Sequence, residues 1–180
     1  MTASVSDLGI IIHQVRFGEA DKFVFIFTAH HGLIKVVGKG ARRLTSKKSP
    51  HLDNLNLIKF QTNRGDIPQY LSQVETVSAF PKIKADLRKT RTCFYLTEIL
   101  HRTLAEGEAD EALFSALKKF LEELNQSAES DCRGLAIEFQ HYLIKRLGFP
   151  PPLSDEPAAL VSYFESLIDR PLMSTQMKIG

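Results

Sequence analysis

The chain has 180 residues, of which 43% are hydrophobic, so it can bury a sizeable core. Two cysteines cannot make a disulfide framework or a four-cysteine zinc site. The sequence shows neither a signal peptide nor an apolar run of about 18 residues. We therefore expect a soluble, cytoplasmic protein without a membrane segment. Residues 1–95 carry fifteen basic and seven acidic side chains (net +8), whereas residues 96–180 carry eight and fourteen (net −6), which favours an acidic partner such as nucleic acid for the first part.

The first eighty residues have the pattern of a small antiparallel β-domain. In one run, Phe23, Phe25 and Phe27 alternate with Val24 and Ile26, which indicates a strand covered on both faces or curled within a barrel. Turn residues such as His31-Gly32 and Asn63-Arg64-Gly65-Asp66 separate the runs. The predicted strands are 8–17, 22–28, 33–37, 55–62 and 68–77. Five short strands favour an oligonucleotide-binding (OB) barrel, with an SH3-like barrel as the alternative.

From Pro81 onward the apolar period becomes helical. One helix is predicted from Pro81 to about residue 105, and a second carries an apolar stripe from Leu113 to Leu124. A third is predicted over 129–147 and a fourth over 157–168, on either side of a proline run at 150–152. The fold class is therefore α+β: a five-stranded OB-fold β-barrel at 1–80, followed by an α-helical domain at 81–180.

A basic loop is the strongest functional signal. Residues 22–52 hold seven Lys or Arg and no Asp or Glu, and the centre of this stretch reads Gly38-Lys39-Gly40-Ala41-Arg42-Arg43-Leu44-Thr45-Ser46-Lys47-Lys48. Glycines let the backbone approach a ligand, and the cations attract phosphates. The spacing is not that of a P-loop, and a merely solvated surface is the alternative. The predicted DNA-binding residues here are Lys35, Lys39, Arg42, Arg43, Lys47 and Lys48.

A second basic cluster falls on the first predicted helix. It comprises Lys82, Lys84, Arg88, Lys89 and Arg91, with only Asp86 opposing it. Either it is an exposed, solvated helix face, or it extends the positive track of the barrel or receives an acidic partner. Under the second interpretation, Arg88, Lys89 and Arg91 join the predicted DNA-binding residues.

Residues suited to catalysis or metal binding do not assemble into a recognisable site. Glu98-x-x-His101 and Glu138-x-x-His141 repeat a spacing found in di-iron helix bundles, but no carboxylates stand out on two further helices. We therefore expect no metal site, no cofactor and no enzymatic activity.

Several motifs, taken together, resemble the RecO family of bacterial recombination mediators. The similarity covers roughly residues 6–153. It is carried by Phe17-Gly18-Glu19-Ala20-Asp21-Lys22, His31-Gly32-Leu33, Gly38-Lys39-Gly40-Ala41-Arg42-Arg43, Arg64-Gly65-Asp66, Phe80-Pro81, Tyr95-Leu96-x-Glu98-Ile99-Leu100 and Leu147-Gly148-Phe149-Pro150.

The resemblance implies a non-enzymatic protein that binds single- and double-stranded DNA, anneals complementary strands and helps load the RecA recombinase. It also implies RecR and the acidic C-terminal tail of single-strand-binding protein as partners. Many family members carry a four-cysteine zinc cluster, which two cysteines exclude here. The C-terminal part is short, but residues 170–174 resemble the usual family ending, so we expect a compact natural protein. An RNA-binding OB protein and a protein-interaction adaptor remain as alternatives.

Overall fold

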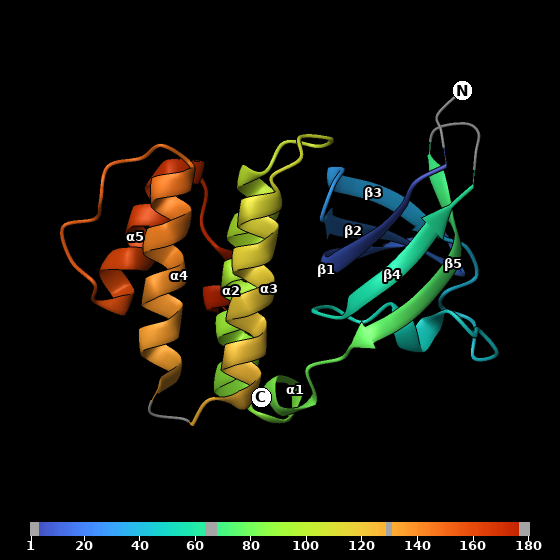
Figure 1. Ribbon diagram of the computed structural model, residues 1–180, viewed down its shortest axis with the longest axis horizontal. Helices are drawn as coiled ribbons and strands as arrows, with labels where there is room; N and C mark the ends of the chain where they lie inside the picture. Colours follow the sequence, from blue (N-terminus) through green and yellow to red (C-terminus); the bar gives the residue numbers. More distant parts are fainter. Residues whose placement is uncertain (1–3, 64–67, 129–130, 177–180) are drawn as a thin grey trace. The chain divides into compact units, whose positions relative to one another are not determined.

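The computed structural model describes residues 4–63, 68–128 and 131–176 (Figure 1). The chain divides into two compact units. The first comprises Met1–Phe80 and Leu104–Phe114, and the second comprises Pro81–Thr103 and Ser115–Gly180. The predicted turn at 64–66 and the predicted start of a helix at residue 129 lie outside the described residues.

Five strands close into a barrel in the order β1-β2-β3-β5-β4. Every pairing is antiparallel except that of β3 with β5, which is parallel. The strands are β1 (Ser6–Phe17), β2 (Asp21–Thr28), β3 (Gly32–Gly38), β4 (Leu57–Thr62) and β5 (Gln69–Ser78). The predicted five-stranded, OB-like barrel is therefore confirmed, and each predicted strand boundary is within about two residues of the observed one.

Alternate residues of the strands fill the barrel. Ile11, Val24, Ile26, Val36, Ile58, Phe60 and Leu71 form the buried cluster together with Ala41 and Leu52, which lie in the long connection between β3 and β4. Gly9 allows β1 to approach β2 closely, because a Cβ there would lie 2.3 Å from Ile26 Cγ2. Ala41 and Leu52 thus tie the long connection into the core while the residues between them remain on the surface.

The segment at residues 104–114 packs on the β2–β3 hairpin. Gly107 N donates to Leu33 O at 2.9 Å, and the ring centroids of Phe27 and Phe114 lie 5.9 Å apart. Phe27 is buried, as predicted for a strand covered on both faces, but Phe23 and Phe25 are only partly covered. The expectation of two covered faces therefore holds for only one end of β2.

The helical part contains α1 (Pro81–Ala85), α2 (Leu87–Thr103), α3 (Glu111–Gln126), α4 (Cys132–Arg146), α5 (Pro157–Ile168) and the 3-10 helix η3 (Met173–Gln176). A further 3-10 helix, η1 (Ser49–His51), lies in the connection between β3 and β4. A helical region after the barrel is confirmed, and the predicted bounds of α5 match. None of the helices in the described part of the chain is long and apolar enough to cross a membrane.

The prediction of one continuous helix from Pro81 to residue 105 is wrong, because Asp86 separates two helices, α1 and α2. Its Oδ1 accepts hydrogen bonds from the backbone N–H groups of Arg88 (2.8 Å) and Lys89 (3.1 Å). An aspartate that satisfies these first amide groups starts a new helix, so α2 begins at Leu87.

Candidate nucleic-acid interface

The basic loop, defined as residues 39–48, is pinned to the turn between β1 and β2. Gly40 N donates to Asp21 Oδ1 at 2.7 Å, and Arg42 N donates to Ala20 O at 2.8 Å. Gly40 has φ +66°, a conformation that glycine adopts without strain. These contacts and the buried Ala41 hold the loop backbone against the barrel, so its cationic side chains extend from a fixed base.

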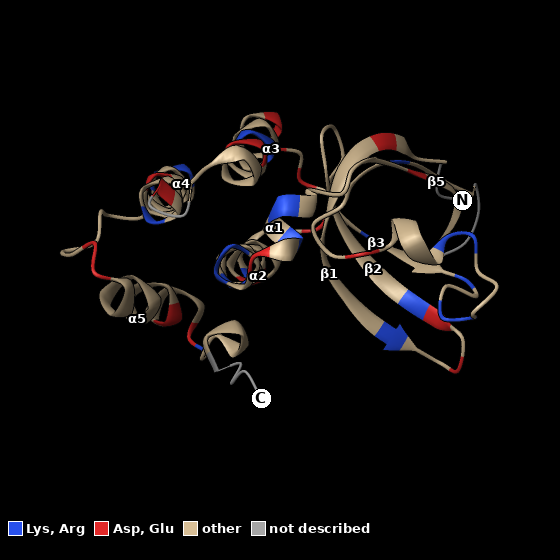
Figure 2. Cartoon of the chain, turned by 90° about the horizontal axis from the view of Figure 1, so that it is seen from below, with Lys and Arg blue, Asp and Glu red and all other residues tan. Residues whose placement is uncertain are grey.

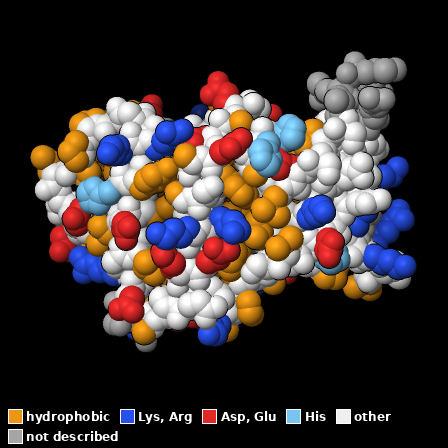
Figure 3. All heavy atoms as spheres, in the orientation of Figure 1, with side chains coloured by type: hydrophobic (Ala, Val, Ile, Leu, Met, Phe, Trp, Pro, Cys, Tyr) orange, Lys and Arg blue, Asp and Glu red, His pale blue; other side chains and the backbone are white. Residues whose placement is uncertain are grey.

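The cations of the basic loop have different surroundings. Lys39, Arg43 and Lys47 are exposed. Arg42 is also exposed, but its Nη1 donates to the carbonyls of Gly18 (3.2 Å) and Glu19 (2.9 Å). A guanidinium has five N–H donors, so Arg42 can bind the turn and still face a phosphate. Lys and Arg residues recur along this connection of the barrel unit (Figure 2), and their side chains gather on this part of its surface (Figure 3).

A shallow cavity of about 460 Å³ adjoins the basic loop. It is lined by Lys39 and Lys48 from the loop and by Asn63, Tyr70, Leu71 and Ser72 from the region of β5. The half-buried Lys48 donates from Nζ to Leu71 O, which holds its ammonium at the cavity wall. Two cations beside an exposed tyrosine make this cavity suited to an anionic, aromatic ligand.

Lys35 lies apart from the basic loop, on the outer wall of the barrel. Its Nζ is 4.1 Å from the ring centroid of Phe23 and 5.6 Å from that of Phe25. Both distances are within the range of a cation–π contact. Sequence reasoning assigned Lys35 to DNA binding but placed the two aromatic rings in a covered face, so it missed the association of all three.

Lys89 was predicted to lie on an exposed basic face, and this is wrong. It is only 5% exposed, and its Nζ donates to Leu124 O (2.9 Å) and Ser127 O (2.8 Å) at the C-terminal end of α3. A cation at this end of a helix satisfies carbonyls that have no partner within the helix. The sequence contained a signal for this position: Lys89 precedes the buried Cys93 by four residues and Leu96 by seven, which puts all three on one helix face.

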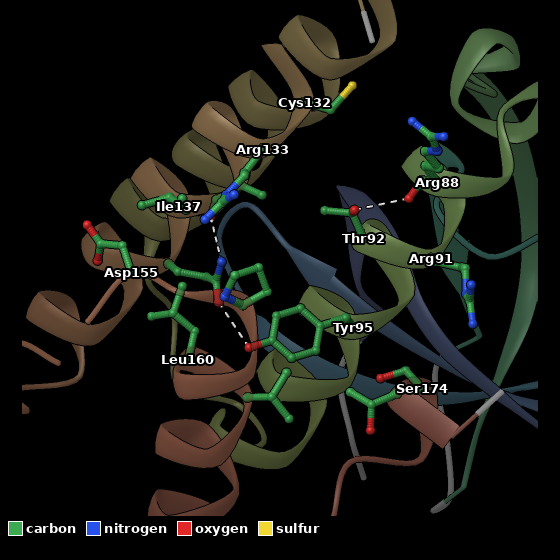
Figure 4. A pocket seen from close by; sticks show the side chains of 15 residues that line it. Arg88, Arg91, Thr92, Tyr95, Cys132, Arg133, Ile137, Asp155, Leu160 and Ser174 are labelled. Carbon is green, nitrogen blue, oxygen red and sulfur yellow. Dashed lines mark hydrogen bonds between the residues drawn. The ribbon is translucent and has the colours of Figure 1, made fainter. Parts of the chain in front are cut away.

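Arg88 and Arg91 are exposed and contribute to a cavity of about 450 Å³ within the helical unit (Figure 4). Arg133, which sequence reasoning did not single out, lies on the same cavity. The other lining residues are Thr92, Tyr95, Cys132, Ala136, Ile137, Gln140, Asp155, Pro157, Leu160, Val161, Ser174 and Thr175. Tyr95 donates to Gln140 Oε1 at 2.9 Å, and burial raises the pKa of the Tyr95 hydroxyl, so the lining there stays neutral. The cavity thus combines an apolar lining with three arginines and the carboxylate of Asp155, and Arg133 also lies 3.5 Å from Glu156.

A polar cluster at the β2–β3 turn is built around the buried carboxylate of Asp7. Its two oxygens bind Nδ1 of His30 and Nδ1 of His31, each at 2.8 Å, and Oδ2 also accepts from His30 N. Burial alone would raise the pKa of Asp7, but these hydrogen bonds outweigh burial and lower it. The hydrogen bond to Asp7 in turn raises the pKa of His30.

The paired Glu-x-x-His motifs do not converge on a common centre. Glu98 accepts from Arg102 and from the backbone amides of Met173 and Ser174, whereas His141 binds Asp155 at 2.6 Å. Within residues 4–63, 68–128 and 131–176, no group of three or more His, Cys, Asp or Glu side chains is placed to hold a metal ion.

Two protein-family models match successive parts of the chain. The family model described as "Recombination protein O N terminal" matches residues 1–80, and the one described as "Recombination protein O C terminal" matches residues 84–159. The chain belongs to the RecO family. The resemblance inferred from the sequence motifs is therefore confirmed.

Individual RecO relatives agree with the family models. Proteins named DNA repair protein RecO are 30% identical to the chain over 147 residues in Dehalococcoides mccartyi, 144 in Pelotomaculum thermopropionicum and 149 in Bacillus pumilus. The matches cover 81%, 80% and 81% of this chain, and 57%, 55% and 56% of the relatives. The chain thus spans little more than half the length of these relatives.

The four-cysteine zinc cluster of many RecO proteins does not fit this chain. It has only Cys93 and Cys132. Burial, above all, raises the pKa of the Cys93 thiol, which opposes the thiolate form that zinc requires.

Proposed function

We propose that the chain binds DNA through the basic loop of its barrel and acts without catalysis in recombinational DNA repair. The observation that carries this proposal is the set of exposed cations Lys39, Arg42, Arg43 and Lys47, displayed from a backbone fixed to the barrel that matches the RecO N-terminal model. Relatives named DNA repair protein RecO support the repair role.

The cations would act on the phosphate backbone, so binding would be electrostatic and insensitive to base sequence. Both single- and double-stranded DNA present such phosphates. Neutralising two complementary strands on one surface would reduce their mutual repulsion, which is the physical basis we propose for strand annealing. Assistance to RecA loading and association with RecR belong to the same proposal.

The arginine-lined cavity of the helical unit is our proposed site for the acidic C-terminal tail of single-strand-binding protein. Arg88, Arg91 and Arg133 could pair with carboxylates, while Tyr95 and Leu160 offer an apolar lining for a hydrophobic end of the tail. Under the adaptor alternative, this cavity of the helical unit, rather than the barrel, would carry the function.

Salt-dependent binding of a fluorescent 20-nucleotide DNA strand tests the barrel proposal. Each phosphate contact contributes about −0.7 to the log–log salt slope, so four to six contacts predict a slope of roughly −3 to −4. A variant with Lys39, Arg43 and Lys47 changed to Ala should lower affinity and make the slope shallower by about 2. Arg42 is retained because it also holds the β1–β2 turn.

The matched control changes Lys119 and Lys145, two exposed lysines of the helical unit, to Ala. It should keep the wild-type affinity and slope. A loop variant with wild-type affinity and slope would contradict the proposal. Competition with RNA of the same sequence decides the RNA-binding alternative, which predicts that RNA displaces DNA at the lower concentration.

The cavity is tested with a labelled peptide of the acidic tail. Changing Arg88 and Arg133 to Ala should weaken peptide binding at least fivefold, because two charge pairs are lost. The control variant Arg170→Ala changes an exposed arginine that does not line the cavity, and it should leave peptide binding unchanged. Equal binding by all variants would exclude this cavity as the tail site.

A further inference from the structure

The outer face of the barrel carries two cross-strand rows of side chains. The strand register puts Val15, Phe23, Val37 and Tyr70 side by side across β1, β2, β3 and β5. The next row contains His13, Phe25 and Lys35. The alternate residues Val24, Ile26 and Val36 fill the barrel core, so both rows lie on the opposite, outer side of the strands. Within the first row Val37 is itself fully buried, whereas Val15 and Tyr70 are exposed.

Aromatic rings cluster on this face in two contacting pairs, and Tyr70 lies in the same row as Phe23, beyond Val37. The ring centroids of Phe17 and Phe23 lie 4.2 Å apart, and those of His13 and Phe25 lie 5.5 Å apart. Phe17 is 40% exposed and Tyr70 is 37% exposed, while Phe23 and Phe25 are partly exposed. We call Phe17, Phe23, Phe25, His13 and Tyr70 the aromatic platform. Clustered, partly exposed aromatic side chains mark an interaction site more often than isolated exposed residues do.

Positive charge borders the aromatic platform. Lys35 reaches over Phe23 and Phe25, and the basic loop follows directly from the end of β3. Tyr70 also lines the cavity that Lys39 and Lys48 share, so the platform and the basic loop meet there. The carboxylate of Asp21, at the nearby turn, is occupied by the amide of Gly40. The surface therefore combines aromatic faces with cations, the chemistry that holds a single strand by its bases and its phosphates.

We propose that the aromatic platform stacks the unpaired bases of single-stranded DNA while Lys35 and the basic loop hold the phosphates. The proposal rests on the DNA-binding function above and specifies the form of DNA that this face takes. In a duplex the base faces are covered by neighbouring base pairs, so the platform contributes only when bases are free. The basic loop alone would bind both forms, whereas the platform would make the barrel prefer single strands.

The test compares a 20-nucleotide thymidine strand with an abasic strand of equal length and charge. Base–aromatic stacking changes affinity by roughly five- to 150-fold per base, so the wild-type protein should bind the thymidine strand at least tenfold more tightly. Changing Phe17 and Phe23 to Leu keeps apolar bulk but removes the rings. This variant should lose at least fivefold in affinity for the thymidine strand and keep both its abasic affinity and its salt slope.

Two further variants make the result decisive. Phe149→Leu is the matched control, because Phe149 is 38% exposed and lies in the helical unit, and it should behave as wild type. Tyr70→Leu replaces the double variant if circular dichroism shows that the latter does not fold, and it should show the same selective loss.

The outcomes separate the two proposals. If the wild-type protein binds neither strand, the DNA-binding proposal itself fails. If it binds both strands equally, or if folded platform variants keep the preference for thymidine, the stacking proposal is overturned while DNA binding stands. If the aromatic platform instead binds a protein partner, the folded platform variants would keep the preference for thymidine.

Discussion

Lys89 tests the packing of the helical unit, because this charged side chain is buried although its charge predicts an exposed position. Replacing Lys89 with Met keeps much of the aliphatic stem but removes two charge-assisted hydrogen bonds to the end of α3. Leu124 O retains a hydrogen bond from Ser127 Oγ, whereas Ser127 O loses the bond from Lys89. A buried acceptor left without its donor costs about 1–3 kcal/mol, and Ser127 is only half-buried, so the low end of this range applies. A hydrogen bond to a charged group contributes about 1.5–3 kcal/mol. Because the two terms overlap, we expect a loss of about 2–4 kcal/mol in the free energy of unfolding.

Urea unfolding at 25 °C, followed by circular dichroism of the helices, measures this loss. The control is Lys119→Ala, which removes an exposed lysine that lies 3.6 Å from Glu123, a surface pair whose loss should cost no more than about 0.5 kcal/mol. Thermal unfolding should agree, with a fall of roughly 4–16 °C for Lys89→Met. Equal stability of the two variants would refute the structural role of Lys89, and Lys89 would then return to the set of candidate DNA-binding residues.

Three further predictions concern the barrel and metal content. Gly32→Ala should lower the melting temperature more than Gly107→Ala. Both glycines have positive φ, but of the two only Gly32 is crowded, because a Cβ there would lie 2.2 Å from the backbone oxygen of Glu108. Equal losses in melting temperature would contradict this packing. Asp7→Asn should destabilise the protein most between the ordinary pKa values of Asp (3.8) and His (6.5). The stabilisation declines as pH falls from the first value through the lowered pKa of Asp7, and as pH rises from the second value through the raised pKa of His30. Melting temperatures of both proteins from pH 3 to 9 check this, and a difference that is constant with pH would refute it. Elemental analysis of the dialysed protein should find no stoichiometric zinc, and one zinc per chain would overturn that expectation.

The barrel could be predicted from sequence because local signals agree there. Alternating apolar residues, glycine turns and short spacing each favour strands, and no strong helix pattern competes with them. Helix α5 was equally predictable, since Pro157 fits its first turn. Agreement between local propensity and the final fold made these elements predictable.

The errors arose where a local cap or a tertiary contact overrides the apolar pattern. A single aspartate divides α1 from α2, although the apolar period continues through it. Lys89 looked like its exposed neighbours because charge was weighed above its position on the apolar face of the helix. The outward rings of β2 looked like core because the strand has apolar residues on both sides. Only the strand register, with His13 and Lys35 beside Phe25, reveals that this face is a partly exposed surface.

Mapping backbone amide chemical shifts during titration with single-stranded DNA tests the central claim most directly. We expect the largest shifts on the basic loop and on the outward residues of β1, β2 and β3, with smaller changes in α3, α4 and α5. Repeating the titration with the Lys39, Arg43 and Lys47 variant should greatly reduce these shifts. Shifts confined to the helices around Arg88 and Arg133, with the barrel unchanged, would contradict the assignment of DNA binding to the barrel.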